Sequence, residues 1–145
     1  MATGNDLRGC IPVLVTPFAE DDSLDRASLE REIDWVIAEG AAGVACVAIA
    51  SEGYKLTEDE RDAVIESTVR HVAGRVPVVA SADGPGEAPA VSRAQRAARL
   101  GADALMVLPP SFVKPGPDAL VSYYARVAEA AGIPIMLQDA PQLTG

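Results

Sequence analysis

Residues 43–61 read GVACVAIASEGYKLTEDER, and this stretch decides the fold. It begins with the apolar run VACVAI at 44–49, which predicts a β-strand covered on both faces. A polar turn follows, and TEDE at 57–60 then fits a capping box. In that box the Thr57 hydroxyl accepts a hydrogen bond from the Glu60 amide, and the Glu60 carboxylate reaches back. A buried strand, a loop and a capped helix make one β/α unit.

The same unit recurs along the chain. Further strands are predicted at 11–17, 77–82, 104–108 and 133–137, each an almost continuous apolar run. Four helical stretches lie between the strands, and a glycine follows each one, as expected where a left-handed residue closes a helix. These glycines are Gly40, Gly74, Gly101 and Gly132. The predicted apolar helix faces are Leu29, Ile33, Val36 and Ile37; Ile65, Val69 and Val72; Val91, Ala94, Ala98 and Leu100; and Leu120, Tyr124, Val127 and Ala131.

A strict alternation of strands and helices leaves two α/β architectures, an open doubly wound sheet or a closed barrel. The open sheet usually carries a glycine-rich loop after its first strand, and TPFAE at 16–20 has no glycine. The even repeat favours a (β/α)₈ TIM barrel, which needs about 250 residues. The chain has 145 residues, so we predict that 1–145 form the first half of one such domain, from the first β/α unit to the fifth strand.

A half barrel has physical consequences. Its first and fifth strands have open edges, and its inner face is exposed. We therefore expect the chain not to be stable alone. The missing C-terminal half-barrel is expected to come from a second chain or from the remainder of a longer one.

The composition excludes several functions. Hydrophobic residues make up 49% and charged residues 23%, as in globular proteins. The net charge of −9 argues against nucleic acid and anionic membranes as partners. Met1 to Arg8 shows no secretion signal, so we expect a cytoplasmic protein. Cys10, Cys46 and His71 fit no metal-binding pattern, and we predict neither a metal nor a cofactor.

Five stretches, in the same order, resemble the dihydrodipicolinate synthase / N-acetylneuraminate lyase family. They are GCIPVLVTPF at 9–18, the stretch at 43–61, GRVPV at 74–78, GADALMVLPPSFVKP at 101–115 and IPIMLQDAPQLTG at 133–145. The resemblance implies a class I lyase, in which a lysine on the sixth strand forms a Schiff base with a 2-keto acid. That lysine lies outside this chain, since neither Lys55 nor Lys114 occupies its position. The resemblance also implies a homo-oligomer, a dimer or a tetramer.

The resemblance assigns site residues to the carboxyl ends of the strands. Where the family has G-T-T-G-E, this chain has AIASE at 48–52. Ala50 and Ser51 are the substrate-binding candidates here. Ser51 is also a catalytic candidate, supplying a hydroxyl and a backbone amide for a carboxylate; alternatively, it only shapes the turn. Glu52 is expected to be a buried acceptor for loop amides; the alternative is a catalytic carboxylate.

Two further positions come from the later strands. Phe112 stands where the synthase has a relay tyrosine; it is a substrate-binding candidate that can also pack across a dimer interface. Gln138 occupies the position of the tyrosine beside the Schiff base and is the second catalytic candidate. Asp139 is a substrate-binding candidate or, alternatively, an acceptor for loop amides. Strand alternation predicts that Gln138 faces the cavity and Asp139 faces away.

Three relay hydroxyls of the family are absent together, at Ala50, Phe112 and Gln138. This argues against the synthase and neuraminate lyase activities, and favours an aldolase or dehydratase acting on pyruvate-type or 2-keto-3-deoxy sugar acids. One alternative is a catalytically silent member that binds a carboxylate metabolite or serves as an assembly partner. Another is an unrelated flavodoxin-like domain, against which the lack of a phosphate-binding glycine loop counts.

Overall fold

The structure is a computed structural model that describes residues 7–110 and 115–140. Within these residues, helices and strands alternate. They are α1 (Arg26–Ala38), β1 (Val44–Cys46), α2 (Glu58–Val72), β2 (Val78–Ser81), α3 (Glu87–Arg99), β3 (Ala104–Val107), α4 (Pro117–Ala131) and β4 (Ile135–Leu137). The strands are parallel and lie side by side in chain order. A doubly wound sheet reverses its strand order at a switch point, and this sheet does not.

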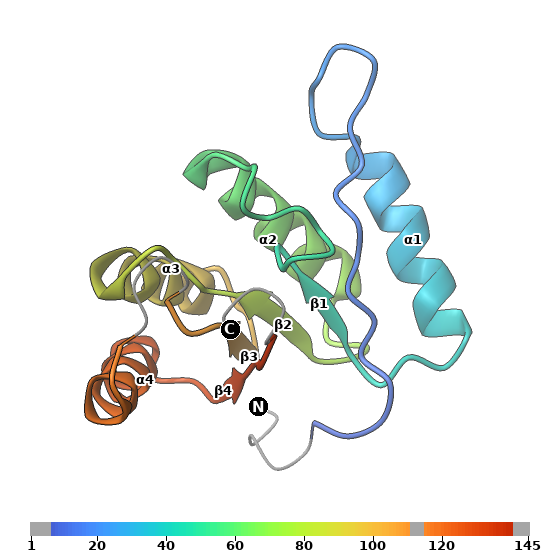
Figure 1. Cartoon of the computed structure of the whole chain (residues 1–145). Coiled ribbons are helices and arrows are strands. Elements are labelled where there is room, and N and C mark those ends of the chain that lie inside the picture. The colour runs from blue at the N-terminus through green and yellow to red at the C-terminus, as the bar shows by residue number, and fades with distance from the viewer. Residues whose placement is uncertain (1–6, 111–114, 141–145) are drawn as a thin grey trace.

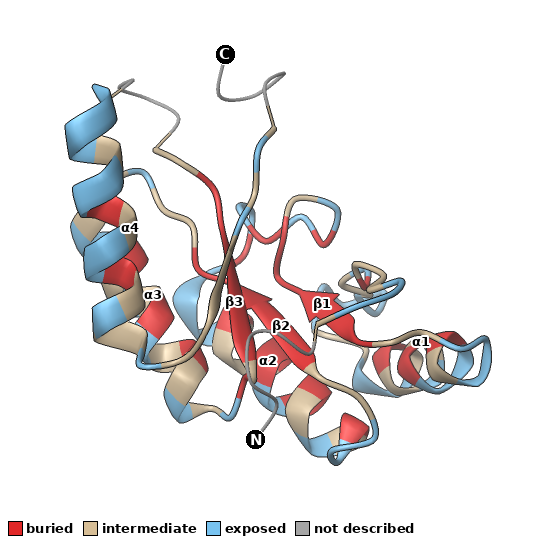
Figure 2. Cartoon of the chain, turned by 90° about the horizontal axis from the view of Figure 1, so that it is seen from below, coloured by how far each residue is buried: buried red, intermediate tan, exposed pale blue. Residues whose placement is uncertain are grey.

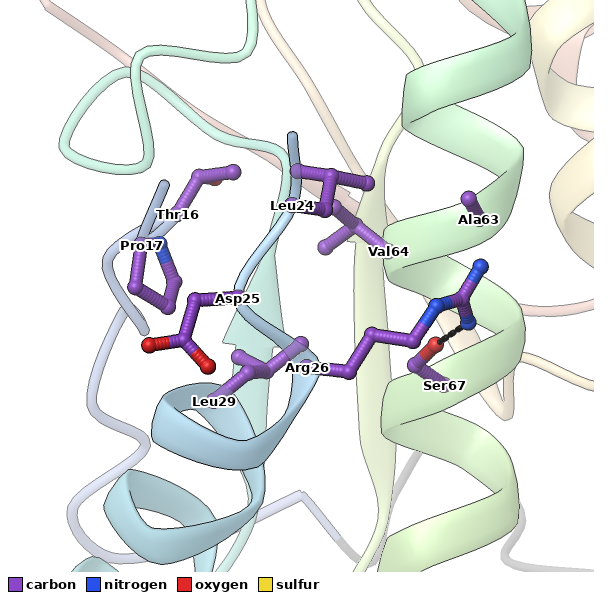
Figure 3. Close-up of a pocket in the computed structure, with 9 residues that line it drawn as sticks. All are labelled: Thr16, Pro17, Leu24, Asp25, Arg26, Leu29, Ala63, Val64 and Ser67. Carbon is purple, nitrogen blue, oxygen red and sulfur yellow. Dashed lines mark hydrogen bonds between the residues drawn. The ribbon is translucent and has the colours of Figure 1, made fainter. Parts of the chain in front are cut away.

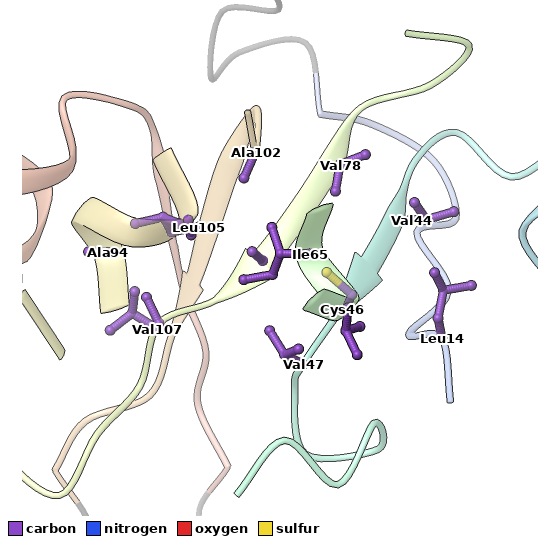
Figure 4. Close-up of a cluster of buried hydrophobic side chains, with 14 of the residues drawn as sticks. Leu14, Val44, Cys46, Val47, Ile65, Val78, Ala94, Ala102, Leu105 and Val107 are labelled. Atoms are coloured by element: carbon purple, nitrogen blue, oxygen red, sulfur yellow. The ribbon is translucent and has the colours of Figure 1, made fainter. Parts of the chain in front are cut away.

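The two faces of the sheet differ in what covers them. The helices form an arc on one side of the strands (Figure 1). Side chains such as Cys46, Leu105 and Val107 point from the strands toward these helices and form the larger core cluster (Figure 4). The opposite face carries a second cluster with no helix residue in it, in which Met106 packs with Val79. Helices on one side of a curved parallel sheet are typical of a barrel wall, which confirms the predicted fold class.

The predicted first strand is wrong as a strand, although its place beside β1 is correct. Residues 11–17 make only an isolated parallel bridge, between Val13 and Ala45. The Leu14 amide donates to the Ala45 carbonyl at 2.8 Å, and the Ala45 amide donates to the Pro12 carbonyl at 2.8 Å. Proline has no amide hydrogen, so Pro12 cannot extend the ladder.

The helix ends follow the predicted chemistry. The capping box is present: the Glu60 amide donates to the Thr57 hydroxyl at 3.3 Å, and the Thr57 amide donates to the Glu60 carboxylate at 2.8 Å. The predicted terminating glycines all have left-handed backbones, with φ between 66° at Gly132 and 96° at Gly101. These local signals fix where each helix begins or ends.

The predicted faces of the last two helices pack against the core. On α3, Ala94 is fully buried, and Val91 and Leu100 pack against the core while partly buried. On α4, Val127 is fully buried, and Leu120, Tyr124 and Ala131 pack against the core while partly buried. The prediction missed the buried Ala90 and Ala97 of α3 and Tyr123 of α4, because alanine-rich helices offer little contrast between their faces.

Two expectations for a half barrel, open strand edges and an exposed inner face, can be compared with the exposure of its residues. Val15, beside β1, is 55% exposed and Leu137, on β4, is 60% exposed, as expected for edges that lack neighbours. The expected exposure of the inner face is wrong at its centre, where Val79 and Met106 are buried. Figure 2 shows β2 and β3, which carry these residues, in the colour of buried residues. The residues packed against that face include Ile11, so the segment before β1 covers part of it.

Candidate functional site

The loops that follow the four strands leave the sheet at one edge, because all the strands are parallel. Among the described parts of these loops, only the loop after β1, residues 47–53, contains non-glycine residues with a left-handed backbone. Val47 and Glu52 have left-handed backbones, with φ of 50° and 53°. Each such conformation costs a non-glycine residue about 1–3 kcal/mol and persists only where surrounding contacts enforce it. Backbone strain of this kind concentrates at functional sites, so we take the 47–53 loop as the centre of the candidate site.

Ser51 ties this loop to the segment beside β1. Its side chain is 1% exposed, and its hydroxyl donates to the Leu14 carbonyl at 2.6 Å. The Thr16 hydroxyl in turn donates to the Ser51 carbonyl at 2.8 Å. Ser51 therefore shapes the turn, while its hydroxyl oxygen can still accept a hydrogen bond. Its catalytic role stays a prediction.

We expect Ser51→Ala to lower the free energy of unfolding by about 1–2 kcal/mol, because the buried Leu14 carbonyl loses its donor. Urea unfolding of the assembled protein measures the change. Ser122→Ala is the matched control, since Ser122 is exposed on α4, and should change the same quantity by less than about 0.5 kcal/mol. Equal effects of the two substitutions would mean that the Ser51 hydroxyl does not hold the loop.

The backbone of the loop presents unused donors. The amides of Glu52 and Gly53 donate back to Ile49 and Ala48, at 2.9 and 3.0 Å. Within the described residues, the amides of Ala50 and Ser51 donate to no backbone carbonyl. Ala50 itself is exposed. Two adjacent free amides at the end of a strand can bind an anionic oxygen.

The prediction that Glu52 is a buried acceptor for loop amides is wrong. Its side chain is exposed, and its carboxylate pairs with the Lys55 ammonium at 2.7 Å. The left-handed backbone at Glu52 lies at the outer bend of the loop, where the carboxylate meets water and not the loop amides. The exposed ion pair leaves Glu52 no role as a buried acceptor.

Gln138 and Asp139 follow β4 at the same edge of the sheet. The Gln138 amide donates to the Val107 carbonyl at 3.0 Å. Its side-chain oxygen Oε1 is buried and has no hydrogen-bond partner among the described residues. A buried acceptor without a donor costs about 1–3 kcal/mol, so this oxygen suits a bound molecule that donates. Asp139 is exposed. Burial raises the pKa of Tyr124 on α4, and the charge of Asp139 raises it further.

The structure therefore brings some of the predicted site residues together and not others. Ser51 and Gln138 lie at the same edge of the sheet, after β1 and β4, and Ala50 lies in the loop beside Ser51. The substrate-binding role of Asp139 stays a prediction. Phe112 lies outside the described residues.

The sequence did not single out Arg61, on α2. Its side chain is only 2% exposed, and its guanidinium donates to the carbonyls of Gly53 at 2.8 Å and Ser81 at 2.7 Å. A signal was available: Arg61 falls one turn before Ile65, on the buried stripe of α2. A charged residue in an apolar stripe indicates a buried polar contact.

A cavity between α1 and α2 is not the site. It is lined by Thr16, Leu29 and Ser67 among others, and Arg26 donates to the Ser67 hydroxyl across it (Figure 3). Its volume of about 10 Å³ holds at most one water molecule. It lies in the layer between helices, whereas barrel chemistry occurs at the carboxyl ends of the strands.

Two kinds of feature are absent from the described residues. No three His, Cys, Asp or Glu side chains gather there as a possible ligand set for a metal ion. None of the helices described combines the length and the apolar character that crossing a membrane requires.

Known proteins match this arrangement. The model of the dihydrodipicolinate synthetase family matches residues 6–145. The chain belongs to this family. Among its family relatives, the chain is 40% identical to a 4-hydroxy-tetrahydrodipicolinate synthase of Methylobacterium radiotolerans, over 96% of the chain and 46% of that protein. It is 41% identical to an L-2-keto-3-deoxyarabonate dehydratase of Azospirillum brasilense, over 92% of the chain and 44% of that protein.

A solved family structure agrees with the fold. YagE of Escherichia coli K12, described as a prophage protein of the dihydrodipicolinic acid synthase family in complex with pyruvate, superposes with a TM-score of 0.92. The two are 32% identical, over 96% of this chain and 47% of the other. The chain thus spans about half the length of the family members it matches. Both the family resemblance and the half-barrel are confirmed.

Proposed function

We propose that this chain supplies the carboxylate-holding half of a Schiff-base 2-keto acid lyase, whose reacting lysine lies in the other half of the barrel. The observation that carries the proposal is the 47–53 loop of a family member, held in a strained shape at the carboxyl end of β1 with two free amides. The amides of Ala50 and Ser51 receive the carboxylate of the keto acid. The lysine amine attacks the keto carbon, water leaves, and the imine withdraws electrons from the adjacent bond.

The proposed substrates are pyruvate or a 2-keto-3-deoxy sugar acid, in an aldolase or a dehydratase. Ala50 and Gln138 have no hydroxyl with which to relay protons, so the substrate hydroxyls or a water carry them. Gln138 cannot transfer a proton near neutral pH, but its amide can bind a substrate hydroxyl through the unpartnered oxygen Oε1. The relatives named above include both a synthase and a dehydratase, so similarity alone does not choose the reaction.

The test is reductive trapping on the assembled protein, meaning this chain together with the polypeptide that completes its barrel. Incubation with pyruvate and borohydride should reduce the imine to a secondary amine and leave a stable adduct, which intact mass spectrometry detects. Peptide mapping should place the adduct on a lysine outside residues 1–145. The same trap with 2-keto-3-deoxyarabonate tests the sugar-acid branch.

The outcomes separate the alternatives. An adduct with turnover of a 2-keto-3-deoxy sugar acid supports the dehydratase or aldolase. Binding of a keto acid with neither adduct nor turnover would favour the catalytically silent member instead. Absence of both binding and adduct with every keto acid tried would overturn the proposal.

A further inference from the structure

We infer that Arg61 is the positioning residue of the 47–53 loop, and that it holds the loop's free amides where a carboxylate binds. The inference rests on the proposed function. Arg61 lies on α2, outside the loop, and reaches it through the buried layer between helix and sheet. It is not a catalytic residue, because it reaches the site only through the backbone that it binds.

Arg61 links the loop after β1 to the end of β2. Nη1 donates to the Gly53 carbonyl at 2.8 Å and lies 3.4 Å from the Val47 carbonyl. Nη2 donates to the Ser81 carbonyl, the last residue of β2, at 2.7 Å. One rigid guanidinium thus fixes the first and last residues of the loop against the neighbouring strand. A lysine ammonium has no such planar fork and cannot reproduce the arrangement.

The charge of Arg61 is not neutralised by an ion pair. None of the ion pairs found among the described residues includes it. The nearby carboxylates are engaged elsewhere, since Glu58 pairs with Arg93 and Asp83 accepts from Ser81. Burial lowers the pKa of the Arg61 guanidinium, and Arg93 lowers it further. Carbonyl oxygens alone therefore hold this cation, and its field favours an anion at the loop.

The loop needs this support because its shape is strained. Val47 is β-branched, and its left-handed backbone is uncommon for such a residue. Its carbonyl also lies so close to Gly53 that a Cβ on Gly53 would sit 2.0 Å away. Without the guanidinium, the Val47 and Gly53 carbonyls lose their buried donor and the loop can relax. The amides of Ala50 and Ser51 would then no longer be held in place.

Reductive trapping with pyruvate on the assembled protein tests the inference. Two quantities are measured, the pyruvate concentration that gives half-maximal trapping and the maximal trapping rate. Arg61→Lys should raise the half-saturating concentration at least tenfold and change the maximal rate less than threefold. Arg70→Lys is the matched control, because Arg70 is exposed on the same helix, and should leave both quantities unchanged. Hydrogen exchange should be faster across 47–53 in Arg61→Lys only.

A second variant separates positioning from general destabilisation. Arg61→Ala should bind pyruvate still more weakly, and added guanidinium should restore part of the affinity. If Arg61→Ala does not fold, Arg61→Lys decides. A lower yield of adduct at an unchanged half-saturating concentration would indicate a purely structural residue and overturn the inference. No adduct in the unmodified protein would instead refute the proposed function.

Discussion

Gly53→Ala is expected to lower the free energy of unfolding of the assembled protein by about 3 kcal/mol and to abolish trapping of pyruvate. The new Cβ would lie 2.0 Å from the Val47 carbonyl oxygen and 2.5 Å from its carbon. Both are backbone atoms and cannot rotate away as a side chain would. It would also lie 3.0 Å from Nη1 of Arg61. The loop must therefore open, which displaces the amides of Ala50 and Ser51.

Gly116→Ala is the matched control for this prediction. Gly116 precedes α4 with φ of −66° and ψ of 165°, a backbone that alanine adopts freely, and its added Cβ would meet nothing within 4 Å. It should cost less than about 1 kcal/mol, the effect of replacing a glycine N-cap. Urea unfolding and the borohydride trap measure both variants. A stable Gly53→Ala protein that still traps pyruvate would contradict the tight packing of the loop.

The sequence predicted the fold where local patterns dominate. Four apolar runs mark β1 to β4 because parallel strands are covered on both faces, and the TEDE capping box marks the start of α2. The run at 11–17 has the same pattern but forms only a bridge. Strand formation there depends on backbone partners on both sides, and Pro12 removes one donor.

The site was predicted less completely, since its geometry comes from contacts distant in sequence. Strand alternation continued past β4 predicts opposite directions for Gln138 and Asp139, and this stays a prediction. No local pattern shows that Ser51 bonds to Leu14, 37 residues earlier, or that Glu52 turns outward. Arg61 was missed because its partners are backbone carbonyls, which have no side-chain identity to read in a sequence. Its place in an apolar stripe was the only local sign.

Leu137→Ala tests whether this chain is completed as a barrel, because its effect depends on residues beyond those described. Leu137 pairs in register with Val107, which is fully buried beneath the helices, yet Leu137 itself is 60% exposed. Its neighbour Met136 points to the inner face, so Leu137 lies on the helix-facing side. In a complete barrel the next helix packs against that side of β4.

In the assembled protein, Leu137→Ala is therefore expected to lower the free energy of unfolding by about 3 kcal/mol, as a large-to-small change in a core does. Val121→Ala is the control: Val121 is 70% exposed on the outer side of α4, and its truncation should cost less than about 0.5 kcal/mol. Urea unfolding of the two variants provides the comparison. Equally small losses would mean that no helix covers Leu137, and that β4 is a true sheet edge and not the middle of a barrel wall.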